Sequence, residues 1–327
     1  MNKTRIEWVQ NPDGGQGYTW NPITGCLNHI NGMCKGGGFP CYAYKLAYGR
    51  LKQRYLANHF TALESFKIGD GDYGNSLADP FYPRFWPDRL IDKDLGNPFD
   101  SSYARMKPKG IFVCDMGELF GDWVPEQWQA EIFSTIASHP YDRFYLLTKQ
   151  PQNLIKFSPF PDNCWVGVTV TGNDAYYPLM FHDPLNLRHI IAKVKYISFE
   201  PLLEKLLPQV KALASDFEMA GIKRVIIGAC TGTLNDLKPT ALKYPKLNLM
   251  PYGKKWTLQP QIEWVQEIVE AADKAGIPVF LKDNLKPILI EDAEHNLYSY
   301  PEWAGKQIAV TSDHKTPMRL LRQEMPE

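Results

Sequence analysis

Short apolar runs alternate with amphipathic segments over most of the chain from residue 109 onward. The apolar runs predict buried strands at residues 110–114, 143–147, 164–170, 195–199, 224–228 and 278–281. Apolar residues at helical spacing predict helices at residues 125–138, 183–192, 202–219 and 260–275, and a short helix from Pro151. This alternation implies parallel strands with crossover helices. We therefore expect an α/β fold with a full or partial (β/α) barrel.

The first hundred residues have a different pattern. Residues 18–20 predict a strand that leads into a cysteine-rich loop at residues 25–42, and residues 42–56 predict one helix. Residues 57–108 are rich in proline, glycine and aromatic residues, which predicts an insertion that covers the barrel as a lid. We expect residues 1–290 to form the barrel and residues 291–327 to form a C-terminal extension packed on it.

Composition and charge indicate a globular protein without a strong overall charge. The chain has 327 residues and 44% hydrophobic content, enough for a sizeable core, and 36 basic residues balance 36 acidic ones. A neutral chain has no global field for nucleic acid or anionic membrane, so such a contact would need a local basic patch. The polar N-terminus and the lack of a long apolar run predict a cytoplasmic protein without a membrane partner.

Three of the six cysteines, Cys26, Cys34 and Cys41, fall within the loop at residues 25–42. In the cytoplasm, clustered cysteines are more often metal ligands than disulfides. Their spacing alone favours a structural zinc site that uses His29 as the fourth ligand. It is also compatible with an iron–sulfur cluster, for which Cys41 would lie at a helix N-terminus that favours a thiolate. A third alternative is a barrel that binds neither metal.

Polar groups follow each predicted strand. In parallel barrels functional groups gather at the carboxyl ends of the strands. The candidates at these ends are Met116, Gly117, Glu118, Lys149, Thr169, Ser198, Glu200 and Cys230. Each also has a structural alternative: a turn at residues 116–118, a solvated strand end at Lys149, a helix cap at Glu200 and a buried apolar cysteine at Cys230.

The order of strand, three-cysteine loop, helix and further βα units resembles the radical S-adenosylmethionine (SAM) superfamily. The segments at residues 20–26, 41–43, 111–113, 118–120, 147–149 and 200–203 are similar to those of a phage-associated family of unknown function allied to that superfamily. The resemblance implies that Cys26, Cys34 and Cys41 bind three irons of a [4Fe–4S] cluster and that SAM chelates the fourth. One electron would then cleave SAM to methionine and a 5′-deoxyadenosyl radical, which abstracts a substrate hydrogen.

The resemblance also implies roles for the strand-end residues. Met116, Gly117 and Glu118 correspond to the motif that binds the amino group of SAM, and Phe39 or Tyr42 would pack on its adenine. Thr169 and Ser198 would contact ribose or carboxylate. Lys149 would neutralise the SAM carboxylate or a substrate phosphate, Glu200 would bind ribose or substrate, and Cys230 would supply a hydrogen atom to a substrate radical.

The cysteine spacing departs from the superfamily pattern. Radical SAM enzymes usually have three and two residues between their cysteines, whereas the gaps here are seven and six. The phage-associated relatives share the wide first gap but keep a short second one. Residues 35–40 fill the second gap, so a cluster requires Cys41 to fold back beside the other two cysteines.

The expected substrate is a nucleic acid or nucleotide, by analogy and from a local basic helix that carries Lys45, Arg50, Lys52 and Arg54. The alternative is that these charged side chains only keep the exposed face of the helix in contact with water. The expected electron donor is a protein such as flavodoxin or ferredoxin.

Overall fold

The computed structural model describes residues 1–58, 78–91, 93–98, 100, 106–181, 187–289, 300–307 and 319–326. The chain divides into two compact units. Unit 1 comprises Met1–Gly36, Cys41–Val168 and Ile190–Lys193. Unit 2 comprises Gly37–Pro40, Thr169–His189 and Val194–Glu327. The cysteines on either side of the second gap thus group with unit 1, whereas Gly37–Pro40 between them groups with unit 2.

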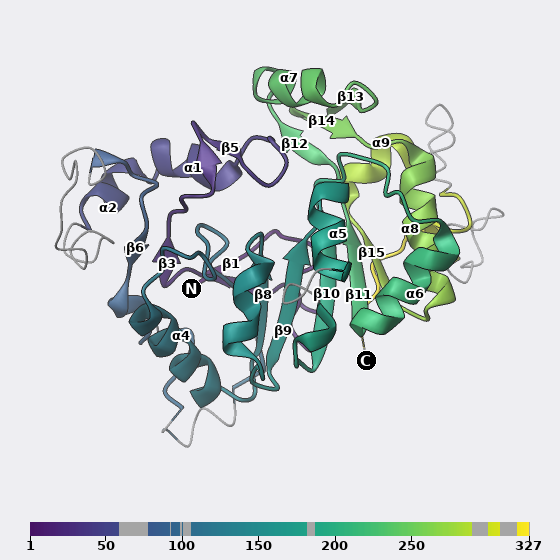
Figure 1. Cartoon of the computed structure of the whole chain (residues 1–327). Helices are drawn as coiled ribbons and strands as arrows, with labels where there is room; N and C mark the ends of the chain where they lie inside the picture. The colour runs from purple at the N-terminus through teal and green to yellow at the C-terminus, as the bar shows by residue number, and fades with distance from the viewer. Residues whose placement is uncertain are drawn as a thin grey trace, which may run out of the picture. The chain divides into compact units, whose positions relative to one another are not determined.

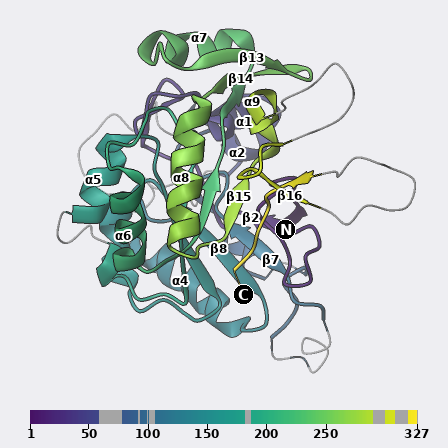
Figure 2. The same ribbon diagram turned by 90° about the vertical axis from the view of Figure 1, so that its right-hand side faces the viewer.

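The strands of the main sheet in unit 1 are β1 (Asn2–Lys3), β2 (Tyr18–Trp20), β7 (Gly110–Val113), β8 (Arg143–Thr148) and β9 (Cys164–Thr169), in that order (Figures 1 and 2). The β1–β2 pair is antiparallel and the other pairs are parallel. Helix α4 (Glu126–Ser138) connects β7 to β8, and the 3₁₀ helix η4 (Pro151–Phe157) connects β8 to β9. Because every residue of β7 and β9 is buried, these strands read as continuous apolar runs in the sequence.

Aromatic side chains fill the core of unit 1. The ring of Trp8 lies 5.0 Å from Phe112 and 5.7 Å from Tyr145, and Trp20 lies 6.0 Å from Phe144. Helix α4 adds Trp128, which stacks on Phe85 at 5.3 Å. Phe85 belongs to β6 (Arg84–Phe85), which pairs antiparallel with β3 (Ile23–Thr24). This pairing fixes the segment that leads into the cysteine loop.

The main strands of unit 2 are β10 (Val194–Phe199), β11 (Ile222–Ile227) and β15 (Val279–Leu281), which are parallel and adjacent in that order. Helices α6 (Val210–Ala220) and α8 (Ile262–Lys274) lie side by side (Figures 1 and 2). Phe217 of α6 packs 6.2 Å from Phe199, and α8 buries Val265, Ile268 and Val269. Helix α5 (Asn173–Phe181) and the 3₁₀ helix η5 (Leu187–His189) precede β10.

A small antiparallel sheet extends from the strand ends of unit 2 (Figure 2). Its strands lie in the order β12 (Cys230–Gly232), β14 (Lys255–Gln259) and β13 (Asn248–Tyr252). Helix α7 (Leu234–Lys243) follows β12 and begins with a capping box between Thr233 and Asp236. The sequence pattern did not predict this sheet or helix.

The remaining elements of unit 2 follow β15. They are the 3₁₀ helix η6 (Asp283–Leu285), helix α9 (Lys286–Leu289) and the paired strands β16 (Gly305–Gln307) and β17 (Arg319–Leu321). The N–H of Leu281 in β15 donates to the carbonyl oxygen of Arg322, 2.8 Å away. The described part of the C-terminal segment therefore packs on β15, while the predicted boundary at residue 290 stays a prediction.

Parallel strands alternate with helices in both units, as expected for a (β/α) barrel, so the predicted α/β class is confirmed. Three helix predictions are wrong in their bounds. The helix expected at residues 42–56 breaks at Gly49 into α1 (Tyr42–Tyr48) and α2 (Lys52–Leu56). The helix expected from residue 202 begins at Val210, because residues 201–209 are loop. Of the helix expected at residues 183–192, the described part holds the 3₁₀ helix η5 at residues 187–189, while α5 lies before this range and residues 182–186 lie outside the described chain.

Two further predictions concern the insertion and the membrane. The described parts of the insertion at residues 57–108 supply β6 and a short 3₁₀ helix, η2 (Pro87–Arg89), to unit 1. Residues 59–77 and 101–105 lie outside the described chain, so the lid stays a prediction. Among the described residues, no helix has both the length and the apolar character that crossing a bilayer requires.

Candidate metal centre

The first gap between the cysteines is a β-hairpin. Strands β4 (His29–Ile30) and β5 (Met33–Cys34) pair antiparallel across the two-residue turn Asn31–Gly32. Both turn residues have positive φ, 47° and 80°, as a type I′ turn requires. The dipeptide Asn-Gly is a strong hairpin signal that our reading of the sequence missed. The seven-residue gap is therefore an ordered element that presents Cys34 at its end.

Cys41 returns to this hairpin. Its N–H donates to the carbonyl oxygen of Gly32 in the turn, 2.8 Å away, and α1 begins at the next residue. The condition that Cys41 fold back towards the other two cysteines is thus met by a backbone hydrogen bond.

The second gap is held from unit 2 by helix α7 and the residue after it. The carbonyl oxygen of Gly37 accepts hydrogen bonds from the Tyr244 hydroxyl at 2.7 Å and from Lys243 Nζ at 3.2 Å. The carbonyl oxygen of Gly38 accepts one from Thr240 Oγ1 at 3.0 Å. The insertion at residues 35–40 is therefore anchored by its backbone.

The three thiols lie close enough to interact electrostatically. Burial raises the pKa of Cys26, and Glu118, Cys34 and Cys41 raise it further. Burial also raises the pKa of Cys34, against the nearby Lys149 ammonium. Each of these two sulfurs accepts a backbone N–H from two residues later: Asn28 donates to Cys26 Sγ at 3.2 Å, and Gly36 donates to Cys34. Burial disfavours the thiolate form, whereas the backbone N–H donors favour it, and cysteine ligates iron as the thiolate.

Two charged residues, Glu118 and Lys149, lie beside the thiols in unit 1. Glu118 is 6% exposed, and its Oε1 accepts from Thr148 Oγ1 at 2.7 Å and from the Phe120 N–H at 3.1 Å. Its Oε2 accepts the Lys149 N–H at 3.3 Å. Burial lowers the pKa of Lys149, but Cys34 and Glu118 outweigh burial and raise it above its usual value. Lys149 is the positive charge beside the thiols.

A close approach of two backbones sets the position of Cys26. The N–H of Gly25 donates to the carbonyl oxygen of Met116, 2.9 Å away, and Gly25 bridges Gly117 in parallel. A side chain at Gly25 would meet the carbonyl oxygens of Phe81 and Tyr82 at 2.5 Å, so only glycine fits. Residues 116–118 therefore lie beside Cys26, and their contact with the amino group of SAM stays a prediction.

The two aromatic candidates point to different surroundings. The Tyr42 hydroxyl donates to the carbonyl oxygen of Asp115, and its ring is 53% exposed. Phe39 is buried and belongs to unit 2. Tyr42 shares a unit with the cysteines, and the adenine contact of either ring stays a prediction.

The remaining candidates belong to unit 2. Thr169 and Ser198 end neighbouring segments, since the Val170 N–H donates to the Ser198 carbonyl oxygen at 2.9 Å. Both side-chain hydroxyl oxygens are buried and have no hydrogen-bond partner among the described residues. An unpartnered buried hydroxyl is costly in a folded protein, so these two atoms have the capacity to bind a polar ligand.

Glu200 and Cys230 lie together in unit 2. Glu200 Oε1 forms an ion pair with Lys282 Nζ. Burial raises the pKa of Cys230 to about 12, and the negative charge of Glu200 contributes to that rise. The alternative in which Glu200 caps a helix from Pro201 is wrong, because the next helix begins at Val210. Lys149, the third predicted catalytic residue, lies in unit 1 beside the thiols.

The structure does not favour a zinc site with His29. Its Nδ1 accepts the Gly32 N–H at 3.3 Å, and the ring also hydrogen-bonds the backbone of Cys26. The ring packs 5.0 Å from Tyr44 and 5.3 Å from Phe81. Among the described residues, no three His, Cys, Asp or Glu side chains, Cys26, Cys34 and Cys41 included, lie close enough to hold one metal ion as they stand.

The comparison with protein families decides the identity of the chain. A family model described as "protein of unknown function (DUF5131)" matches residues 3–241. The chain belongs to the DUF5131 family. No curated protein shows significant similarity to the chain.

Solved structures of spore photoproduct lyase resemble this DUF5131 member in part. The lyase complexed with dinucleoside spore photoproduct is 11% identical with a TM-score of 0.44, and the match covers 84% of this chain and 78% of the lyase. A double mutant with bound AdoMet and dinucleoside spore photoproduct is 10% identical with a TM-score of 0.46 and coverages of 85% and 80%. Likeness at this level establishes no activity for this chain. Neither description mentions a phage, so the phage association stays a prediction.

Proposed function

We propose that this DUF5131 member is a radical SAM-type enzyme in which Cys26, Cys34 and Cys41 bind a [4Fe–4S] cluster. The observation that carries the proposal is a single loop in which Cys41 bonds back to the hairpin that holds Cys34, with backbone N–H groups directed at the sulfurs of Cys26 and Cys34. Thiolates are the usual ligands of such clusters, and hydrogen bonds to sulfur tune their potentials. The donor set therefore fits the group.

Three protein ligands leave one iron of the cluster open. His29 is engaged by Gly32 and Cys26, which favours a site with three ligands over a closed site with four. An open position lets an exchangeable cofactor coordinate, and we place SAM there. When bound, the cluster and SAM supply one-electron chemistry and a deoxyadenosyl group that accepts a substrate hydrogen.

Each unit offers residues that would bind a cofactor or substrate group. In unit 1, Lys149 is the cation that would attract the SAM carboxylate, and Glu118 holds the Lys149 backbone in place. In unit 2, the unpartnered hydroxyls of Thr169 and Ser198 would accept or donate hydrogen bonds to a polar ligand. We assign a nucleic acid or nucleotide as substrate and a cytoplasmic flavodoxin or ferredoxin as electron donor.

Metal analysis after anaerobic purification tests the proposal. Protein reconstituted with iron and sulfide should contain about four irons per chain and show a broad visible absorption band. Cys26→Ser, Cys34→Ser and Cys41→Ser should each lose iron, while Cys164→Ser, a buried cysteine of β9, should retain it. Reduction in the presence of SAM should release 5′-deoxyadenosine. A colourless protein with stoichiometric zinc would overturn the proposal.

A further inference from the structure

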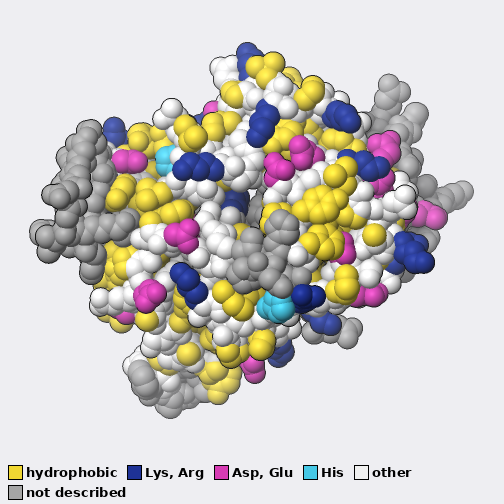
Figure 3. Space-filling view, viewed as in Figure 1, with side chains coloured by type: hydrophobic (Ala, Val, Ile, Leu, Met, Phe, Trp, Pro, Cys, Tyr) yellow, Lys and Arg dark blue, Asp and Glu magenta, His cyan; other side chains and the backbone are white. Residues whose placement is uncertain are grey.

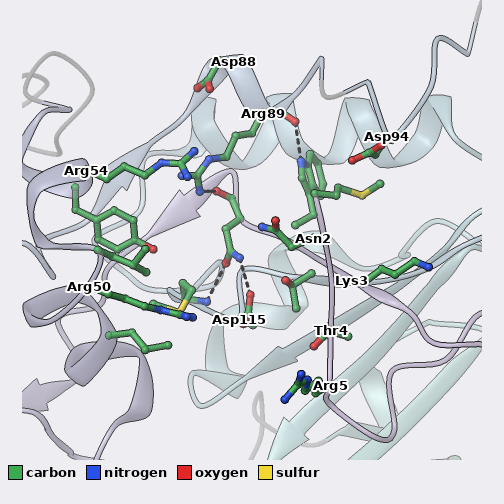
Figure 4. A pocket seen from close by; sticks show the side chains of 18 of the residues that line it. Asn2, Lys3, Thr4, Arg5, Arg50, Arg54, Asp88, Arg89, Asp94 and Asp115 are labelled. Atoms are coloured by element: carbon green, nitrogen blue, oxygen red, sulfur yellow. Dashed lines mark hydrogen bonds between the residues drawn. The ribbon is translucent and has the colours of Figure 1, made fainter.

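Positive side chains gather in a pocket of unit 1. On the face shown in Figure 3 basic and acidic side chains are interspersed, so any excess of one sign is local. One such excess lines a cavity of about 900 Å³ between the N-terminal residues, α1 with α2, and η2 (Figure 4). Its charged lining consists of Lys3, Arg5, Arg50, Arg54, Arg89 and Lys93 against Asp88, Asp94 and Asp115.

Two guanidinium groups share one aromatic ring in this pocket. The Cζ atoms of Arg89 and Arg54 lie 4.1 Å and 6.0 Å from the centre of the Trp86 ring. Burial lowers the pKa of Arg89, and the charge of Arg54 lowers it further. Two positive charges beside the same ring repel one another in a partly desolvated site. An anion between them would remove that repulsion.

The charges of these arginines are not neutralised by close ion pairs within the described chain. Neither Arg50 nor Arg54 forms an ion pair with a described carboxylate, and Arg89 donates to the neutral carbonyl oxygen of Asn21 at 2.5 Å. The Asp115 carboxylate accepts instead from Asn21 Nδ2, also at 2.5 Å. Figure 4 shows Arg54 and Arg89 extending towards one another across the cavity. Guanidinium donors therefore remain available to a ligand.

A buried tyrosine lines the pocket together with the three arginines. Tyr55 is 3% exposed, and burial raises its pKa to about 12; Asp115 raises it further, while Arg89, Arg54 and Arg50 act in the opposite direction. A neutral hydroxyl donor beside guanidinium groups matches a tetrahedral oxyanion, which accepts several hydrogen bonds at once.

We propose that this pocket binds a phosphate group of a nucleic acid or nucleotide through Arg50, Arg54 and Arg89. Guanidinium groups bind phosphate with paired, charge-assisted hydrogen bonds, and Arg is preferred over Lys where that geometry matters. The assignment of this phosphate to the substrate rests on the proposed function. The binding itself depends only on the pocket.

One apolar layer separates the pocket from the thiols. Tyr55 and Met116 line the pocket and belong to a cluster with Ala43, Ala47 and Phe81. Cys26 and Cys41 pack against the same cluster. A phosphate held by the arginines would thus fix a substrate at a set position relative to the candidate metal centre, which is the function of a remote anchor in catalysis.

Binding measurements on the full chain without added iron test this proposal. The probes are a fluorescent single-stranded oligonucleotide and AMP, titrated at low salt. Arg54→Gln should weaken binding of whichever probe binds by about tenfold, the loss expected for a charge-assisted hydrogen bond. Lys52→Gln removes the same charge from the same helix but does not line the pocket, so it should change affinity less than about twofold. Arg50→Gln should behave as Arg54→Gln does.

The two probes distinguish the sources of the phosphate. Tight binding of the oligonucleotide with weak binding of AMP identifies a strand, and comparable binding of both identifies a nucleotide. Equal affinities for Arg54→Gln and Lys52→Gln, or no binding of either probe, would overturn the proposal. Because iron is absent from the assay, a failure of the cluster proposal would leave this result unaffected.

Discussion

The backbone N–H of Cys41 donates a hydrogen bond to the carbonyl oxygen of Gly32 over 2.8 Å. This single bond joins the third cysteine to the turn of the hairpin that carries the second. The two unusually wide gaps of the cysteine motif therefore do not separate its members in space. The turn at Asn31–Gly32 becomes as important for the candidate metal centre as the cysteines.

The turn can be tested with a matched pair of glycine variants. Gly32 and Gly14 have nearly the same φ, 80° and 82°, but a side chain at Gly32 would meet Tyr44 at 2.5 Å, whereas Gly14 has nothing within 4 Å. Gly14→Ala should cost about 1 kcal/mol for its backbone conformation. Gly32→Ala should cost at least 1 kcal/mol more, roughly the cost of overpacking, and should reduce iron uptake. Urea unfolding measures the stability of each variant, and iron analysis measures its iron content. Equal iron contents in the two variants would show that the turn does not position Cys41.

Glu118 is expected to stabilise unit 1 through its hydrogen bonds. Glu118→Leu leaves the Thr148 hydroxyl and the Phe120 N–H without their acceptor, which should lower the free energy of unfolding by about 2–4 kcal/mol. Adding Thr148→Val to that variant should cost less than Thr148→Val costs alone, since their shared bond is already lost. Denaturant unfolding of the four proteins of this cycle gives the coupling, and strict additivity would contradict it.

Asp115 predicts a pH dependence of stability. Burial raises its pKa from 3.8 to about 6, against a hydrogen bond from Asn21 and the charge of Arg89. The folded state thus binds the proton more tightly than the unfolded state. This contribution to stability is fully present below about pH 4 and is lost as the pH rises through 6. It amounts to at most about 3 kcal/mol, at ~1.4 kcal/mol per pKa unit.

The variant Asp115→Asn isolates that contribution. It retains an oxygen that accepts from Asn21 but does not titrate, so it should be more stable than the parent above pH 6 and should lose the slope between pH 4 and 6. Unfolding midpoints measured across this range test the prediction. A parallel pH profile in both proteins would mean that Asp115 has an ordinary pKa.

Two ion pairs of unit 2 should differ in their contribution to stability. The side chains of Lys282 and Glu200 are only 15% and 24% exposed, whereas those of Lys205 and Glu267 are 52% and 32% exposed. Lys282→Met leaves a mostly buried carboxylate without its partner and should cost about 2–4 kcal/mol. Lys205→Met should cost about 0–1 kcal/mol. Thermal unfolding compares the two, and similar losses would contradict the difference in burial.

The sequence predicted the parallel strands well because they are buried on both faces. Residues of β7, β9 and β10 are all buried, so each strand appears as an uninterrupted apolar run. The helix bounds were harder to predict. Residues 202–209 contain leucines at spacing that suits a helix, but Leu202 and Leu203 are buried in a loop whose N–H groups bond Gly228 and Thr171. Tertiary hydrogen bonds overrode the local pattern there.

The candidate site was predictable in its residue types but not in its architecture. Cys26, Cys34, Cys41, Glu118 and Lys149 were singled out from the sequence, and the structure brings these five together. The bond from Tyr244 to Gly37 spans 207 residues, and no local pattern indicates a contact of that kind. Arg89 of the phosphate pocket was missed because it lies in the irregular insertion, where no periodicity relates it to Arg54.

The anchoring of the second gap has a consequence for finding further members of the family. Helix α7 and Tyr244 hold carbonyl oxygens of residues 37 and 38, which every amino acid possesses. Glycine is favoured at Gly37 and Gly38, where a Cβ would approach Leu203 at 3.0 Å and Lys243 at 3.2 Å, and Phe39 is buried. A search pattern should therefore fix the number of residues between the second and third cysteines, these two glycines and an apolar residue at position 39, and leave Lys35 and Gly36 open to substitution.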